Sequence, residues 1–81
     1  MFYTYILKSK KNGSYYIWSC EDVNVRIKLH NSGLVKSTKR YISWSIVLKE
    51  EYKTLSEARK RELQIKSWKK RSSIEKLLKI L

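Results

Sequence analysis

The chain has 81 residues, with 19 lysines and arginines against 7 aspartates and glutamates, for a formal net charge of +12. This length allows one domain, residues 1–81, with a thin core. A composition with 42% hydrophobic residues, three tryptophans and six tyrosines excludes intrinsic disorder. The single cysteine, Cys20, excludes an internal disulfide framework and a cysteine-based zinc site, and indicates a reducing, cytoplasmic location.

The excess of positive charge predicts a polyanionic partner, with nucleic acid as the first candidate and an anionic membrane surface as the second. No apolar run approaches the roughly 20 residues of a membrane span, and the N-terminal sequence does not have the form of a signal peptide. We therefore expect no membrane-spanning segment. Peripheral binding through the last helix is an alternative, but its leucines are better explained as a cover for the sheet.

Two segments at the start of the chain predict a β-hairpin. Residues 2–8 and 14–20 are rich in aromatic and β-branched side chains, which favour strands. Asn12-Gly13 between them is typical of a two-residue type I′ turn. Such a turn pairs Tyr5 with Cys20.

Alternation along the hairpin places Tyr5, Tyr16 and Trp18 on one face of the sheet. The simpler interpretation of these side chains is an aromatic core beneath helices.

The remaining elements follow from capping signals and periodicity. Residues 22–30 predict a helix with Asp22 as N-cap and a stop at residues 31–33. Residues 34–43 form a basic connector, and residues 44–52 predict a strand in which Trp44, Ile46 and Leu48 share one face.

Two capping boxes, at residues 54–57 and 72–75, predict helices over 55–68 and from Ser72 to Leu81. The fold class is therefore α+β: a small three-stranded antiparallel sheet flanked by helices, in the order β-β-α-β-α-α.

The first helix carries Arg26 and His30 on the same face as Val23 and Ile27. Charged and polar groups avoid an apolar face unless they are paired. The simpler interpretation is that His30 closes the helix near its C-terminus, where a cation is favoured, and that Arg26 is a solvated charge.

The second long helix places a carboxylate, Glu62, on its apolar side with Leu55, Ala58 and Ile65. An ordinary surface glutamate would lie among the basic residues of this helix. The alternative is an ion pair between Glu62 and Lys66, one helical turn on.

These candidates form no Ser-His-Asp or Cys-His arrangement, but they suit phosphodiester cleavage. A carboxylate can hold Mg²⁺ or Mn²⁺, and arginine matches the oxygens of a phosphate. Tyrosine and histidine can relay a proton.

The motifs resemble the GIY-YIG endonucleases of the small bacterial type, over almost the whole chain and in order. The matching segments are Tyr3-Thr4-Tyr5-Ile6-Leu7, Tyr15-Tyr16-Ile17-Trp18, Asp22 through Arg26, His30-Asn31-Ser32-Gly33, Lys36-Ser37-Thr38-Lys39, Ser43-Trp44, Ser56-Glu57-Ala58 and Arg61 through Trp68.

The resemblance implies a metal-dependent DNA endonuclease and a role for each residue. Tyr16 would help activate the attacking water as general base, and Tyr5 and His30 would support the proton network. Arg26 would stabilise the charge on the phosphate, and Glu62 would anchor one Mg²⁺ or Mn²⁺ ion.

The chain departs from the family pattern at Trp18, where the second motif ends in glycine. Glycine at such a position implies close backbone approach or a need for space. An indole there would obstruct substrate or metal, or would stack on a base. An alternative function is therefore a nucleic-acid-binding domain of the same fold that has lost cleavage. Ser43 also replaces the family's proline, and the polar residue that completes some family sites has no clear counterpart.

Basic residues in the connector and in the last third of the chain predict contacts with the phosphates of DNA, including branched or structured DNA. They are Lys36, Lys39, Arg40, Arg59, Lys66, Lys69, Lys70 and Arg71. No module that reads base edges is recognisable, so weak sequence specificity is expected. An RNA reader that stacks bases on the sheet is disfavoured, because the RNP1 pattern and a fourth strand are absent from the sequence.

Overall fold

The structure is a computed structural model that describes residues 1–80. Its elements are β1 (Phe2–Ser9), β2 (Tyr15–Cys20), α1 (Val23–Ser32), the 3₁₀ helix η1 (Lys39–Tyr41), β3 (Trp44–Tyr52), α2 (Leu55–Ser67) and α3 (Arg71–Ile80). The predicted α+β class and the order of strands and helices are confirmed. The predicted end of the last helix at Leu81 lies outside the described residues.

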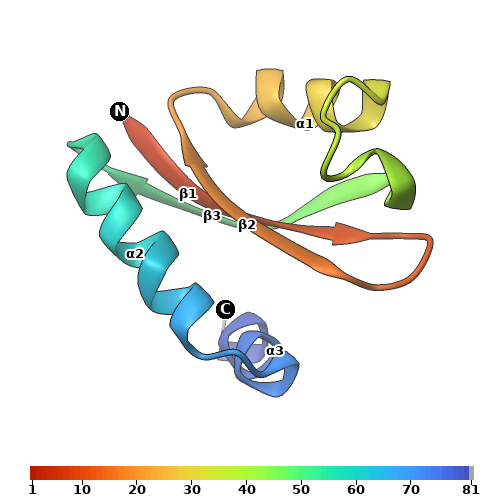
Figure 1. Ribbon diagram of the computed structural model, residues 1–81. Helices are drawn as coiled ribbons and strands as arrows, with labels where there is room; N and C mark the ends of the chain where they lie inside the picture. The colour runs from red at the N-terminus through yellow and green to blue at the C-terminus, as the bar shows by residue number, and fades with distance from the viewer. Residues whose placement is uncertain (81) are drawn as a thin grey trace.

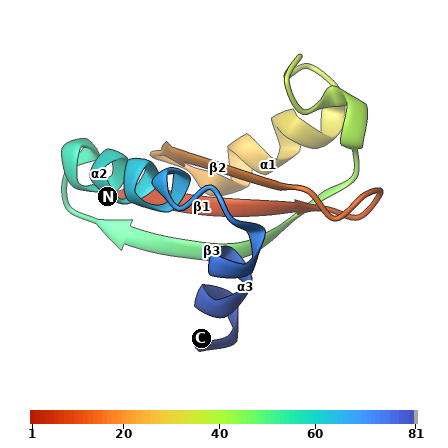
Figure 2. The same cartoon turned by 60° about the horizontal axis from the view of Figure 1, so that its bottom comes forward.

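The three strands form one antiparallel sheet in the order β2-β1-β3, with β2 at an edge. Helix α1 covers one face of the sheet, while α2 and α3 lie on the other (Figure 1). Figure 2 shows the same separation from below, with α3 set at an angle to α2. Within the described residues, no helix is long and apolar enough to cross a membrane.

Alternation along β1 builds a separate core on each face of the sheet. Tyr5 and Leu7 are fully buried in the cluster under α1, together with Val23 and Trp44. Ile6, between them in sequence, is buried on the other face with Ile65 of α2 and Ile74 of α3. The two faces are therefore distinct environments that meet only around the edges of the sheet.

The predicted register of the hairpin is wrong by two residues. Tyr5 lies opposite Trp18, not Cys20. The loop is four residues long because Ser9 and Ser14 close it through the backbone, at 2.8 Å from N to O. Asn12 does not take the positive φ that a type I′ turn requires, and only Gly13 of the loop does, at 74°.

The side chain of Ser9 explains this loop, since its Oγ accepts the backbone N–H groups of Lys11 and Asn12 at 3.1 and 3.3 Å. A shift of two residues leaves every side chain on its face, whereas a shift of one would reverse them all. Tyr5, Tyr16 and Trp18 therefore still belong to one side of the hairpin.

Strand β3 does not alternate as predicted. Ile6 pairs with Leu48, but Leu7 pairs with Ile46, so Val47 is an extra residue in the ladder. Such a bulge changes which face the following residues occupy. Trp44 consequently packs under α1, while Leu48 packs on the face covered by α2.

The caps of the first two helices agree with the sequence, and that of the third does not. Asp22 accepts the N–H of Val25 at 3.2 Å, and Thr54 accepts the N–H of Glu57 at 3.2 Å. Helix α1 continues to Ser32, and ends at Gly33 with φ 83°. Helix α3 begins at Arg71, one residue before the predicted capping box, where an ion pair of 2.9 Å joins Arg71 to Glu75.

Candidate active site

A hydrogen-bonded chain of three buried side chains lies between β1 and α1. The Tyr5 hydroxyl is 3.3 Å from Nε2 of His30, and Nδ1 of His30 is 2.8 Å from Oγ1 of Thr38. Tyr5 and His30 are 0% exposed and Thr38 is 1% exposed. The two turns of α1 that follow Asp22 bring His30 over β1, and the basic connector returns Thr38 to the same place.

The surroundings favour one tautomer of His30. The carbonyl of Val35, 3.4 Å from Oγ1 of Thr38, can only accept the hydroxyl proton, and in that arrangement Oγ1 accepts from Nδ1–H of His30. Nε2 of His30 then accepts the proton of the Tyr5 hydroxyl. Burial, reinforced by the charge of Arg26, lowers the pKa of His30 below its ordinary value of 6.5. His30 is therefore neutral at neutral pH.

Tyr5 and Tyr16 occupy different environments beside His30. Burial raises the pKa of Tyr5 to about 12, against the opposing effect of Arg26. Tyr16 is only half-buried, and its ring meets the His30 ring edge-on at 4.9 Å between centroids. Tyr5 is thus a protonated donor inside the chain, whereas Tyr16 lies at its open side.

Arg26 supplies the positive charge of this cluster. Its guanidinium is near enough to lower the pKa of both Tyr5 and His30. Its Nε is buried and has no hydrogen-bond partner among residues 1–80. A buried N–H group without a partner is costly, so an anion bound beside Arg26 would satisfy it.

Glu62 lies on the other face of the sheet. Its Oε1 accepts a hydrogen bond from Ser19 of β2 at 2.7 Å, and its Oε2 pairs with Lys66 at 2.8 Å. Glu62 is 7% exposed. It lines a cavity of about 300 Å³ together with Trp18, Ser19, Arg59 and Leu63. The structure contains both the ion pair with Lys66 that was the alternative interpretation and the predicted position of Glu62 on the apolar side of its helix.

Trp18 joins the two halves of the site around the edge strand β2. Its indole stacks on Tyr16 with ring centroids 6.1 Å apart and an angle of 19° between the rings. The ammonium of Lys66 lies over the same indole, 4.2 Å from its centroid. The side chain that replaces the motif glycine therefore stands between Tyr16 and the Glu62–Lys66 pair.

The structure brings Tyr5, Tyr16, Arg26 and His30 together on one face and leaves Glu62 on the other. Sequence reasoning missed two residues that hold this arrangement. Thr38 orients His30, and Ser19 orients Glu62. Alternation from Trp18 gave a signal for Ser19, because the next residue of an edge strand faces the opposite helix.

The donor set at Glu62 limits which metal site is feasible. Residues 1–80 hold no group of three His, Cys, Asp or Glu side chains that could enclose an ion. A single carboxylate on an open cavity fits Mg²⁺ or Mn²⁺, which accept water and phosphate oxygens as further ligands. Lys66 occupies one oxygen now, but its side chain is 37% exposed and can swing into water.

The predicted phosphate-binding residues divide by their contacts. Lys66 and Arg71 are exposed but make contacts within the molecule, the first with Glu62 and Trp18, the second with the Tyr15 ring and the carbonyl of Gly13. The remaining predicted residues are also exposed: Lys36, Lys39, Arg40, Arg59, Lys69 and Lys70.

Comparison with known proteins agrees with this architecture. The family of the GIY-YIG catalytic domain matches residues 1–76. UPF0213 proteins of Staphylococcus aureus are 38% identical over 73 residues, which is 89% of this chain and 88% of theirs, for strain Mu3 and for SAV0488 of strain Mu50. The chain therefore belongs to the GIY-YIG family, whose members are generally nucleases.

A solved structure shows the same fold. The solution NMR structure of the UPF0213 protein BH0048 from Bacillus halodurans is similar with a TM-score of 0.63 and 33% sequence identity. The similarity covers 99% of this chain and 85% of that one. The GIY-YIG fold predicted from the motifs is thereby confirmed.

Proposed function

We propose that this protein is a metal-dependent DNA endonuclease that hydrolyses phosphodiester bonds. The observation that carries the proposal is the buried cluster on the α1 face, in which Arg26 has an Nε without a partner beside the Tyr5–His30 pair. A guanidinium whose Nε is buried and unpartnered, next to a proton relay, suits a phosphate that gains charge during cleavage. Most buried donors in a purely structural core have a hydrogen-bond partner.

Each side chain has a proposed task. Tyr16, at the open side of the cluster, assists the activation of the attacking water. His30 and Tyr5 hold the proton network around it, and Arg26 stabilises the developing negative charge. Glu62 holds one Mg²⁺ or Mn²⁺ ion, which when bound supplies charge neutralisation and a lower pKa for bound water.

We propose DNA as the partner and the cytoplasm as the location. The exposed basic residues named above contact phosphates of DNA, including branched or structured DNA, with little reading of bases. Residues 1–81 act as one nuclease domain. The free cysteine Cys20, whose thiol pKa burial raises, is compatible with a reducing cytoplasm.

A second candidate function has its own observation. Trp18 lies against both Tyr16 and Lys66, and Lys66 neutralises Glu62. If these contacts persist with DNA bound, the ion site stays closed and the protein is a binding domain without cleavage. A base that stacked on the indole would instead displace Lys66 and expose Glu62.

The experiment is a cleavage assay on a panel of supercoiled, branched, duplex and single-stranded DNA, with Mg²⁺ and then Mn²⁺. Wild type should nick at least one substrate, while Glu62→Ala should lose cleavage and keep DNA binding. A Trp18→Gly variant distinguishes the candidates. Cleavage by this variant but not by wild type supports the binding domain, and no cleavage by either one rejects the nuclease.

A further inference from the structure

The tip of the β1–β2 hairpin connects two basic segments that are far apart in the sequence. On one side, the ammonium of Lys11 lies 3.5 Å from the carbonyl of Arg40, in η1. The backbone N–H of Lys10 donates to the carbonyl of Ser43 at 2.8 Å. These bonds hold the cations of the loop beside those of η1.

The other side of the tip receives the start of α3. Arg71 donates from Nη1 to the carbonyl of Gly13 at 2.6 Å. A Cβ at Gly13 would lie 3.1 Å from Nη2 of Arg71, so the glycine allows this close approach. Lys69 and Lys70 directly precede the residue whose side chain reaches the tip.

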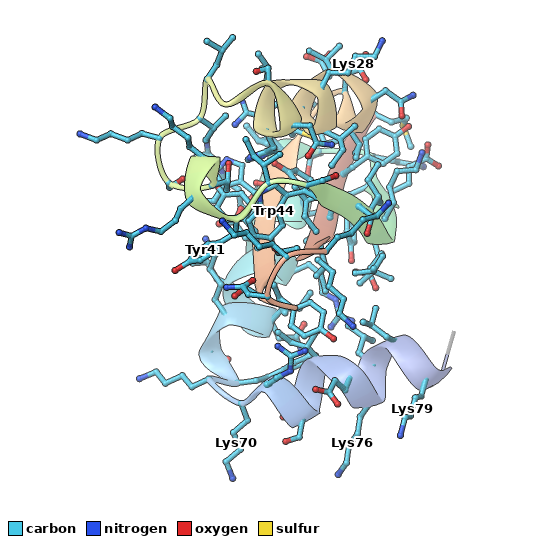
Figure 3. All side chains as sticks on the ribbon, turned by 90° about the vertical axis from the view of Figure 1, so that its right-hand side faces the viewer. Lys28, Tyr41, Trp44, Lys70, Lys76 and Lys79 are labelled. Carbon is cyan, nitrogen blue, oxygen red and sulfur yellow. The ribbon has the colours of Figure 1, made fainter. Side chains whose placement is uncertain are left out.

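We name these exposed residues the hairpin-end platform: Lys10, Lys11, Lys39, Arg40, Lys69 and Lys70. Figure 1 shows the hairpin tip and η1 together at the right of the molecule, with α3 below the sheet. Figure 3 looks at that side, and Lys70 there reaches away from the sheet. The platform thus spans both faces of the sheet around a tip that bears two lysines.

Acidic residues are concentrated at the opposite end. Segments 1–20 and 23–49, which build the tip, η1 and the connector, contain no aspartate or glutamate. Glu75, near the start of α3, is paired with Arg71. Glu21, Asp22, Glu50 and Glu51 lie at the end of β2 and the end of β3, far along the strands from the tip.

We infer that the hairpin-end platform is the docking surface for the sugar–phosphate backbone of double-stranded DNA. Exposed lysines and arginines without neighbouring carboxylates attract phosphates and release their counterions. Cations on both sides of a narrow tip can contact the phosphates of two strands that border one groove, which a single strand does not offer. The inference rests on DNA as the proposed substrate and adds where it binds.

The test measures binding of a 20-base-pair duplex by fluorescence anisotropy in EDTA, over a series of salt concentrations. Lys10→Gln with Lys11→Gln removes two platform charges. The matched control, Lys53→Gln with Lys60→Gln, removes two exposed charges from the segment after β3 and from α2. Because net charge is equal in the two variants, a difference between them reports position.

The platform variant should reduce the slope of log K against log salt by about 1.8, because two phosphates are no longer neutralised, and the control should leave it near the wild-type value. Lys69→Asn with Lys70→Gln should act like the tip variant, since asparagine tolerates the left-handed backbone of Lys69, with φ 55°. Equal weakening by control and platform variants would overturn the inference, because charge alone would then explain binding.

Two further measurements distinguish duplex DNA from other polyanionic partners. A single strand of the same length should bind more weakly than the duplex and respond less to the tip variant. Vesicles containing phosphatidylserine should bind the tip variant and the control variant equally well. A larger difference between the two variants on vesicles than on DNA would overturn the inference. Because EDTA prevents metal-dependent cleavage, a failed nuclease assay leaves the result of this binding test unaffected.

Discussion

The two faces of the sheet hold their polar residues in different ways. Under α1, His30 is bonded through both ring nitrogens to side chains that are themselves buried. Under α2, the carboxylate of Glu62 is bonded to a buried serine but also to Lys66, which reaches into water. The buried polar groups on the α1 face therefore satisfy one another's hydrogen bonds. The carboxylate on the α2 face is instead paired with a partly exposed cation that can be replaced.

This difference gives the two faces different proposed roles: the α1 face holds a fixed arrangement of side chains, and the α2 face determines whether Glu62 is available. Groups that are buried and bonded to one another keep their geometry without a ligand. The side chain of Lys66 is partly exposed, so a divalent ion can replace it as the partner of Glu62 while the ammonium returns to water. We expect the α1 face to set the arrangement of the proton network, and the contacts of Trp18 and Lys66 to decide when Glu62 is available.

The largest effect should follow from removing His30. His30→Ala leaves the Tyr5 hydroxyl and Thr38 without a partner and opens a cavity, so the free energy of unfolding should fall by about 3 kcal/mol. Urea denaturation followed by tryptophan fluorescence measures it. His30→Gln, which retains some hydrogen bonding, should show a clearly smaller decrease in the free energy of unfolding. A loss below about 1 kcal/mol in the alanine variant would show that the chain of bonds is not closed as described.

The protonation of His30 should make stability depend on pH. Its pKa in the folded state is lowered below 6.5 by burial and by Arg26. The unfolded state therefore binds the proton more readily, and stability from neutral His30 is complete above pH 6.5 and declines as pH falls toward the lowered pKa. The slope should not exceed about 1.4 kcal/mol per pH unit.

The measurement is the free energy of unfolding of wild type against that of His30→Gln between pH 7 and 5. The difference between them should narrow as the pH falls. A constant difference over that range would contradict a neutral, buried His30.

On the other face, Glu62→Gln should cost only about 1 kcal/mol of stability, because the amide oxygen still accepts from Ser19 and Lys66 is freed into water. Urea denaturation followed by tryptophan fluorescence measures this loss as well. A loss as large as that of His30→Ala would mean that the faces do not differ as proposed.

The smallest effect on stability should come from Lys66→Met, a few tenths of a kcal/mol for one i, i+4 pair. Its effect on metal binding should be larger, because the competing cation is gone. Broadening of amide signals near Glu62 by Mn²⁺ should occur at a lower Mn²⁺ concentration than in wild type. Unchanged broadening would show that Lys66 does not compete for the carboxylate.

The elements and faces followed from local signals. Capping residues and alternation located the three strands and two of the helices, and placed Glu62 and His30 against the sheet. The predicted faces of the hairpin residues were correct despite the wrong register, because the register error was an even number of residues. Local chemistry therefore predicts which side a residue faces more securely than which residue it pairs with.

What the sequence did not predict depends on contacts between distant segments. The loop register follows from Ser9 capping its own loop, and the bulge at Val47 from pairing with β1. The role of Thr38 beside His30 became visible only when the connector was placed, and alternation gave the face of Ser19 but not its hydrogen bond to Glu62. Trp18 was recognised as a departure, but its contact with Lys66 across the sheet edge required the fold.

The central claim is that Glu62 and the α1-face cluster cut DNA together. The most direct measurement is the nicking of one supercoiled plasmid with Mn²⁺ by wild type, Glu62→Gln and Trp18→Gly, purified in the same way. Wild type should nick, Glu62→Gln should be at least about 100-fold slower, as for loss of a group that stabilises the transition state, and Trp18→Gly should retain activity. Equal nicking by wild type and Glu62→Gln would contradict the claim.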